Sequence, residues 1–301
     1  MQPRSFMQNV LRLLLLFVAF NLIGSVVTLV LLRSLFNIDG VDVINQLQSA
    51  DVSASTINAL KFMQFIQVFF SFIIPAHLFA RSQSNNQVID YLSLHTTHWK
   101  HFLIGALLIF AISPLVTFSS AINEQITFPS YFSNIEHYFK NQQIQSQKFA
   151  TLFLKDNTGK DLLINLFVVG VLAAFSEELF FRGVLQKLLI NHFNNMHLAI
   201  FACAILFSSL HQEFYALIPR ILLGLLLGYA YVYSKSLWVP ILIHFINNAS
   251  AVLLDSFFKQ GITSFNPNSN DYFGIAGVLI SFVATIALFW YWQKNKAPSI
   301  L

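Results

Sequence analysis

The chain has 301 residues, of which 56% are hydrophobic and 10% are charged, and its formal net charge is +4. Because soluble proteins carry about 25% charged residues, this composition excludes a soluble globular protein and indicates a membrane protein with several spans. The single cysteine excludes an intramolecular disulfide framework, and no cluster of basic residues indicates a nucleic-acid partner.

A helix needs about 20 mostly apolar residues to cross the hydrocarbon core of a bilayer. The sequence predicts eight such helices, at residues 10–32, 62–80, 101–122, 162–189, 198–213, 216–233, 237–254 and 272–292. The fifth is short. A polar connection at 34–60 follows the first helix, and a long loop is predicted at 123–160, after the third. We therefore expect an all-α fold, a polytopic membrane helical bundle with about eight transmembrane helices.

An even number of spans places both termini on the same side of the membrane. The 17 lysine and arginine residues divide nine to eight between the two sides, so the positive-inside rule leaves the orientation open. The basic residues at the start of the first helix favour termini in the cytoplasm.

Two adjacent glutamates lie inside the apolar fourth helix, in the stretch FSEELFFRG. A carboxylate near the bilayer interior costs several kcal/mol, so such a residue is a functional candidate. Glu178 and Arg182 are four residues apart, and a helix stacks them one turn apart, where they neutralise each other. Glu177 has no partner in this stretch and is the candidate to take a proton from water. The alternative interpretation is that both glutamates mark the wet end of a span.

Two further polar stretches lie on later helices. FSSLH places His211 at the end of the fifth helix, and HFINN places His244 and Asn248 one turn apart on the seventh. Counted from the flanking turns, Glu177 and His211 lie about 20 Å deep and His244 about 10 Å deep. We predict that these three helices converge on one polar cavity, although a lone intramembrane histidine is often a packing residue.

The ordered set EExxxR, FxxxH and HxxxN resembles the CPBP family of intramembrane endopeptidases, which includes CAAX prenyl endopeptidases and bacteriocin-processing and self-immunity proteins. The motifs here are Glu177-Glu178-x-x-x-Arg182, Phe207-x-x-x-His211 and His244-x-x-x-Asn248. The resemblance covers roughly residues 160–255.

The resemblance implies a division of the chain into three parts. Residues 1–160 would form N-terminal transmembrane helices and loops, residues 161–256 the catalytic helical core, and residues 257–301 a C-terminal transmembrane helix and tail.

The resemblance also implies a role for each motif residue. Glu177 would activate a water, and His211 would hold that water or the glutamate. His244 and Asn248 would donate hydrogen bonds to the developing oxyanion, a task for preorganised donors in a dry site.

The remaining motif residues are expected to support this set. Glu178 belongs with the catalytic residues and pairs with Arg182, and Phe207 shapes the pocket wall or simply packs there.

No cofactor is favoured. A divalent metal such as zinc is the alternative, with Glu177, His211 and His244 as ligands, because catalytic zinc often has three protein ligands and a water. The sequence lacks HExxH, and these ligands would come from three separate helices.

The expected function is that of an intramembrane glutamate protease. It would hydrolyse a peptide bond of a membrane-associated protein or peptide, with a prenylated CAAX-type protein as one such substrate. The alternatives are a non-catalytic membrane scaffold or bacteriocin-immunity protein and, behind these, a proton-coupled transporter, for which inverted repeats are lacking. Expected partners are membrane lipid and the substrate, without nucleic acid, and the expected location is a bacterial plasma membrane.

Two aromatic or histidine-rich stretches have ordinary interpretations. The histidines of HTTHWKH, which are His95, His98 and His101, are expected in a solvated interfacial loop and helix start. Trp290 and Trp292, with the tyrosine between them, are expected in an interfacial aromatic belt.

Overall fold

A computed structural model describes residues 5–48, 52–155, 157–265 and 273–298, and every regular element among them is a helix. The elements of the first half are α1 (Phe6–Leu31), η1 (Leu32–Phe36), α2 (Gly40–Gln48), α3 (Ala54–Val68), η2 (Phe69–Ile73), α4 (Ile74–Gln83), α5 (Val88–Tyr91), α6 (Trp99–Glu124), η3 (Ser130–Phe132) and α7 (Ser133–Phe153). Those of the second half are α8 (Gly159–Asn165), η4 (Leu166–Leu172), α9 (Ala173–Phe180), η5 (Phe181–Gln186), α10 (Lys187–Phe193), α11 (Met196–Leu210), η6 (Phe214–Ala216), α12 (Leu217–Ser234), α13 (Trp238–Lys259) and α14 (Gly274–Lys294).

The all-α prediction is confirmed, and seven of the eight predicted spans are long enough to cross a membrane. Among the described residues these spans are Phe6–Phe36, Ala54–Gln83, Trp99–Glu124, Gly159–Phe193, Phe214–Ser234, Trp238–Lys259 and Gly274–Lys294. The remaining predicted span, the fifth, at 198–213, corresponds to α11, which has 15 residues. A helix of that length is about 22 Å long, whereas the hydrocarbon core is about 30 Å thick.

The predicted long loop at 123–160 is wrong, because it contains α7, a helix of 21 residues. Its residues are mostly polar, so it contains no apolar run of the kind that predicts a span. An aromatic contact holds it to the bundle, with the Phe139 ring 5.0 Å from that of Phe214. The connection at 34–60 is likewise helical over α2 and the first turns of α3.

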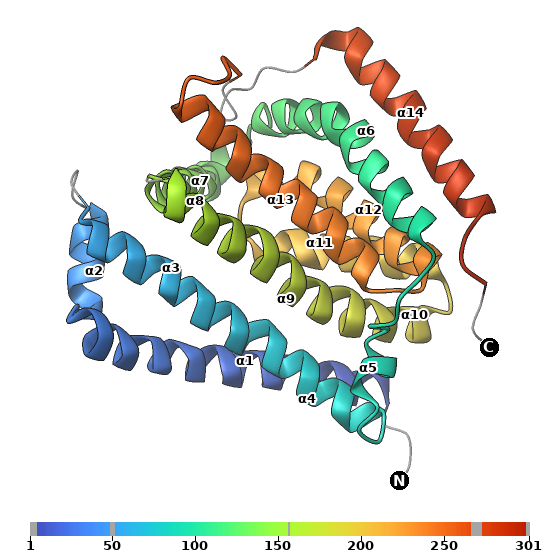
Figure 1. The fold of residues 1–301 in the computed structure, drawn as a ribbon, viewed down its shortest axis with the longest axis horizontal. Helices are drawn as coiled ribbons and strands as arrows, with labels where there is room; N and C mark the ends of the chain where they lie inside the picture. The colour runs from blue at the N-terminus through green and yellow to red at the C-terminus, as the bar shows by residue number, and fades with distance from the viewer. Residues whose placement is uncertain (1–4, 49–51, 156, 266–272, 299–301) are drawn as a thin grey trace.

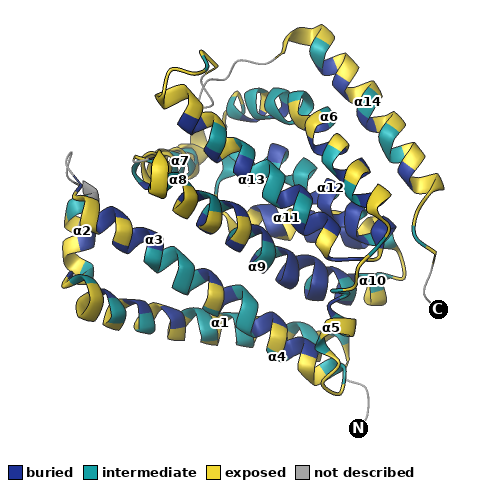
Figure 2. Ribbon diagram, viewed as in Figure 1, coloured by how far each residue is buried: buried dark blue, intermediate teal, exposed yellow. Residues whose placement is uncertain are grey.

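The helices form a layered bundle in which the second half of the chain is central (Figure 1). α1 and the α3–α4 run lie along one edge, and α6 and α14 lie along the opposite edge. Between them α9 and α10 run beside α11, α12 and α13. Buried residues gather on these central helices, whereas α1 and α14 expose many residues (Figure 2). Large apolar side chains such as Leu22 and Ile280 are among those exposed, as expected of helices that face lipid.

The centre of the bundle depends on a close approach of α11 and α12. Gly224 and Gly228 are one turn apart on α12, a spacing that lets membrane helices pack closely. A Cβ atom on Gly224 would lie 2.9 Å from the Cβ atom of Ala204 on α11. The missing side chain therefore sets the distance between these two helices.

The predictions of a solvated interfacial stretch for the histidines and of an interfacial aromatic belt do not hold for one residue of each. His101 and Trp292 are both buried, and the indole Nε1 of Trp292 donates a hydrogen bond of 2.8 Å to Nδ1 of His101. This contact joins α14 to α6. A buried indole N–H needs such an acceptor, and neither stretch of sequence shows that the two helices meet.

Candidate active site

The two glutamates lie on α9, a short α-helical segment between two π-helical segments, η4 and η5. The carboxylate of Glu178 and the guanidinium of Arg182 are fully buried, and their nearest oxygen and nitrogen are 2.7 Å apart. This confirms the predicted pair one turn apart. Arg182 also donates a hydrogen bond of 3.1 Å to the backbone oxygen of Gly224, so the pair ties α9 and η5 to α12.

Phe207 is the aromatic centre around which the site residues are arranged. The guanidinium of Arg182 lies 4.8 Å from its ring centroid. The rings of His211 and His244 lie 5.0 and 6.0 Å from it, both near edge-to-face. The Phe207 side chain thus spaces the two imidazoles.

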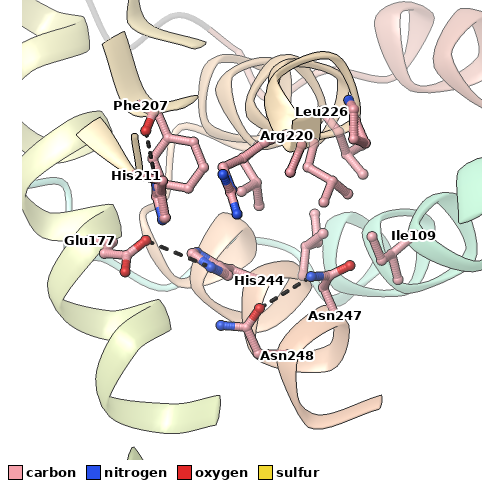
Figure 3. Close-up of a pocket in the computed structure, with 14 residues that line it drawn as sticks. Ile109, Glu177, Phe207, His211, Arg220, Leu226, His244, Asn247 and Asn248 are labelled. Carbon is pink, nitrogen blue, oxygen red and sulfur yellow. Dashed lines mark hydrogen bonds and ion pairs between the residues drawn. The ribbon is translucent and has the colours of Figure 1, made fainter. Parts of the chain in front are cut away.

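His244 lies between the two glutamates. Its Nδ1 is 2.9 Å from Oε1 of Glu178, and its Nε2 is 3.9 Å from Oε2 of Glu177. An ionised carboxylate only accepts hydrogen bonds, so Nδ1 carries the proton shared with Glu178. Nε2 is then turned toward Glu177 and the cavity (Figure 3).

This geometry corrects the predicted depth difference between Glu177 and His244. The error comes from measuring both residues from turns assumed to be level. Ser93 accepts a hydrogen bond from Nζ of Lys187 through its hydroxyl and one from the backbone N–H of Leu237 through its carbonyl, so this one loop residue links the two helices and gives a common reference point. Counted from there, Glu177 is 187 − 177 = 10 residues along its helix and His244 is 244 − 237 = 7 along its own, about 15 and 10 Å.

His211 caps the end of α11 and faces the same cavity. Its Nδ1 lies 2.8 Å from the backbone oxygen of Phe207. A carbonyl only accepts, so this nitrogen carries a proton. In the neutral ring the Nε2 lone pair is then free to accept a proton or a hydrogen bond from water.

Asn248 is engaged with the protein backbone. Its Nδ2 donates 3.0 Å to the carbonyl oxygen of Val169 in η4, and its Oδ1 accepts 3.1 Å from Nδ2 of Asn247. One amide hydrogen of Asn248 is therefore committed to holding η4 against α13. The predicted oxyanion role has to use the remaining amide hydrogen.

The predicted residues that face open space share one cavity of about 320 Å³ (Figure 3). Its lining residues are Ile109, Glu177, Phe207, His211, Ala216, Pro219, Arg220, Leu223, Leu226, Leu227, Ile243, His244, Asn247 and Asn248. Glu178 and Arg182 lie behind this lining. The predicted convergence of three helices on one cavity is present in the fold.

The zinc alternative can be tested on side-chain geometry. Across the described part of the chain, no three His, Cys, Asp or Glu side chains are grouped as a metal ion would require. Glu177, His211 and His244 share the cavity, and the Nδ1 contacts of the two histidines leave each Nε2 open, as the outer hydrogen bonds of zinc-ligating histidines do. The orientation of the rings therefore suits a metal ligand, whereas the three side chains are not gathered around one point.

Comparison with known proteins places this site in a family. Residues 159–250 match the family described as type II CAAX prenyl endopeptidase, Rce1-like. This part of the chain is an Rce1-like CAAX endopeptidase domain. The matched range includes α8 through most of α13, and with them all three motifs. The family is one of peptide-bond hydrolases.

Two bacterial proteins are similar to part of this chain. The uncharacterized protein YpbD of Bacillus subtilis (strain 168) is 30% identical over 89 residues, 28% of this chain and 42% of that protein. An uncharacterized 24.3 kDa protein of Escherichia coli is 26% identical over 105 residues, 34% of this chain and 48% of that protein. The chain thus spans less than half the length of each. No solved structure was found to match.

Two lining residues of the CAAX endopeptidase domain were missed by the sequence reasoning. Arg220 stands in the apolar run LIPRILL, and an intramembrane cation is a signal that could have found it. Asn247 precedes a motif residue on the helix, about 100° away, and no pattern marked it. Both line the cavity.

Proposed function

We propose that this chain is an integral-membrane endopeptidase that cleaves a peptide bond with a water activated by Glu177. The observation that supports this most is the position of His244 Nε2, 3.9 Å from the Glu177 carboxylate in a shared cavity. A base and a candidate oxyanion donor then face the same reacting carbonyl from two helices. This arrangement suits acyl transfer to water.

The first step is attack of water on the substrate carbonyl. Glu177 takes a proton from the water while the water oxygen bonds to the carbonyl carbon. The carbonyl oxygen then becomes an oxyanion. His211 assists by accepting a hydrogen bond from the same water through Nε2, the nitrogen that its contact with Phe207 leaves unprotonated.

The oxyanion is stabilised by His244 and by amide hydrogens of the neighbouring asparagines. Because Nδ1 donates to Glu178, Nε2 donates only when the ring is an imidazolium. Glu178 and Arg182 together are neutral, and Glu177 balances the imidazolium before the reaction. When the C–N bond breaks, Glu177 returns its proton to the leaving amine.

The substrate is proposed to be a membrane-associated protein or peptide, with a prenylated CAAX-type protein as the first to test. A groove of about 470 Å³ with a mostly apolar lining shares Ile109, Leu223 and Asn247 with the catalytic cavity. A lipid chain attached to the substrate could lie there while the peptide reaches Glu177. The similar bacterial proteins and the seven candidate spans support a place in a bacterial plasma membrane.

Cleavage of a farnesylated CAAX peptide by the full chain in nanodiscs tests the proposal. The wild-type protein should release the C-terminal tripeptide, and Glu177→Gln should not. A scaffold or immunity protein would cleave no peptide of any kind. A transporter would instead show a pH-driven solute flux that the same substitution abolishes. Cleavage that persists in Glu177→Gln excludes the proposed mechanism.

A further inference from the structure

Arg220 is a cation in the catalytic cavity that the proposed reaction does not use. It lies in the first turn of α12, directly after Pro219, and its guanidinium points into the cavity between His211 and His244 (Figure 3). Its side chain is 21% exposed, and the cavity lining includes it. An arginine at this depth is expensive to place and is a functional candidate.

One edge of the Arg220 guanidinium is occupied and the other is not. Nη2 donates a hydrogen bond of 2.7 Å to Oε2 of Glu213. Nη1 is buried, and within the described residues it has no hydrogen-bond partner. A buried donor that stays unpaired costs free energy, so a ligand that supplies an acceptor to Nη1 gains what the free protein lacks.

Glu213 holds the guanidinium of Arg220 in place through Nη2 and leaves Nη1 without a partner. Burial raises the pKa of the Glu213 carboxyl, but the charge and hydrogen bond of Arg220 outweigh this and hold the pKa below its ordinary value. Glu213 is therefore ionised at neutral pH. The pair fixes the guanidinium in one orientation, as a binding site requires.

The acceptor that best fits a guanidinium edge is a carboxylate. Arginine keeps its charge at every physiological pH and presents planar donors that match carboxylate geometry. A neutral peptide carbonyl would use one donor and leave the charge uncompensated. The negative charge of Glu177 in the same cavity also disfavours a substrate carboxylate anywhere except against Arg220.

We propose that Arg220 is a specificity-determining residue whose free Nη1 edge binds a carboxylate of the peptide substrate, either its C-terminal group or an acidic side chain. This rests on the proposed endopeptidase function. Bound there, the carboxylate holds the peptide with one of its carbonyl groups beside Glu177. A substrate without that charge reaches the same site with lower affinity.

Three farnesylated peptides separate the two sources of the carboxylate. The first ends in a free acid, the second is its carboxamide, and the third is a carboxamide whose last residue is Asp. Affinities are measured on the full chain carrying Glu177→Gln in nanodiscs, so that no cleavage interferes. We expect at least one carboxylate-bearing peptide to bind about tenfold or more tightly than the neutral one.

The same measurements on Arg220→Gln and Arg220→Lys test the residue itself. Arg220→Gln should remove the preference, and Arg220→Lys should restore part of it, since it keeps the charge without the fork. Arg33→Gln is the matched control, because Arg33 is exposed and pairs with Asp39 outside the cavity. It should leave the preference unchanged.

Cleavage kinetics distinguish specificity from other roles. In the otherwise wild-type chain, Arg220→Gln should raise KM for the carboxylate-bearing peptide that wild type prefers. It should leave kcat for that peptide nearly unchanged. Equal loss of kcat on all three peptides would assign Arg220 to the oxyanion or to folding and overturn the proposal. Equal affinity for the three peptides, or no binding of any, overturns it as well. If wild type cleaves nothing while the acid preference persists, the endopeptidase proposal fails and the carboxylate site stands.

Discussion

Glu178 accepts a hydrogen bond of 2.9 Å from Nδ1 of His244 on a second helix, and this contact decides which ring nitrogen faces the cavity. The same carboxylate oxygen, Oε1, also accepts from Arg182 at 2.7 Å. One oxygen therefore links a guanidinium and an imidazole that lie on different helical segments. The contact orients His244, and Arg182 supplies the positive charge that makes a fully buried carboxylate tolerable.

We expect Glu178→Gln to destabilise the protein strongly. The substitution leaves the buried Arg182 charge without its counter-charge, and breaking one side of a buried ion pair costs about 3–5 kcal/mol. Unfolding of the detergent-solubilised protein with denaturant measures this loss. Cleavage should fall as well, because the neutral amide oxygen accepts more weakly from Nδ1 of His244 than the carboxylate does.

The double substitution Glu178→Leu with Arg182→Met separates the two effects. Replacing a buried ion pair with apolar residues of similar volume is often neutral or stabilising. The double variant should therefore recover most of the stability and remain inactive. A Glu178→Gln protein as stable as wild type would contradict the assigned role of the pair.

Unlike Glu178→Gln, the substitution Glu177→Gln should abolish cleavage and leave stability almost unchanged. Its carboxylate is 15% exposed and its nearest ion-pair partner is 3.9 Å away, so the amide should fit with little loss of stability. Removal of a general base lowers the rate by about 10²- to 10⁴-fold. Peptide cleavage and thermal unfolding, measured on the same preparation, test the expected loss of rate and the expected stability.

Asp39→Asn is the control for this carboxylate. Asp39 pairs with Arg33 at an exposed position, where both side chains are more than half accessible. It should leave cleavage unchanged. If Glu177→Gln keeps wild-type activity, or loses it only through unfolding, Glu177 is not the base.

The sequence predicted the site better than it predicted the packing around it. Glu178 and Arg182 follow from a four-residue spacing on one helix, and the local geometry of a helix guarantees that they stack. That Glu177 and His244 approach to 3.9 Å could not be counted from turns, because the level of each helix depends on contacts such as those of Ser93. Long-range contacts set the offset between helices.

Other errors have the same physical origin. The α7 helix was missed because it is polar, and the search relied on apolar length. His101 and Trp292 were expected at the surface because each stretch was interpreted alone, yet they are 191 positions apart and hydrogen-bonded. Arg220 entered only as one of many positive charges, and only the folded chain shows that its guanidinium lines the cavity.

Replacing each of the two neighbouring asparagines with alanine should change the stability of the protein to a different extent. Asn248→Ala removes the side-chain donor to the Val169 carbonyl in η4, a part-buried contact, and the loss of such a hydrogen bond costs about 0.5–1.5 kcal/mol. Asn247→Ala removes a lining amide but leaves the backbone contact intact. We expect both to slow cleavage, and only Asn248→Ala to lower the unfolding temperature clearly.

The Asn248→Asp variant makes this comparison sharper. A carboxylate cannot donate to the Val169 carbonyl, so the stability loss should match or exceed that of alanine. If Asn248→Ala is as stable as wild type, the contact between α13 and η4 does not hold the site together. Equal stability losses in Asn247→Ala and Asn248→Ala would contradict the division of roles.

The close approach of α11 and α12 gives a prediction that does not depend on catalysis. In Gly224→Ala the new Cβ would lie 2.9 Å from Cβ of Ala204, so the helices must separate, at a cost of about 1–3 kcal/mol. The separation also lengthens the hydrogen bond from Arg182 to the Gly224 carbonyl.

Ala204→Gly alone should cost about 1 kcal/mol through helix propensity. The double variant loses the closest contact, although the new Cβ still lies 3.1 Å from the Cα atom of residue 204. It should therefore recover part of the loss and be more stable than the sum of the two losses predicts. A double-mutant cycle by denaturant unfolding measures this coupling, and strictly additive losses would show that Gly224 does not set the spacing of the two helices.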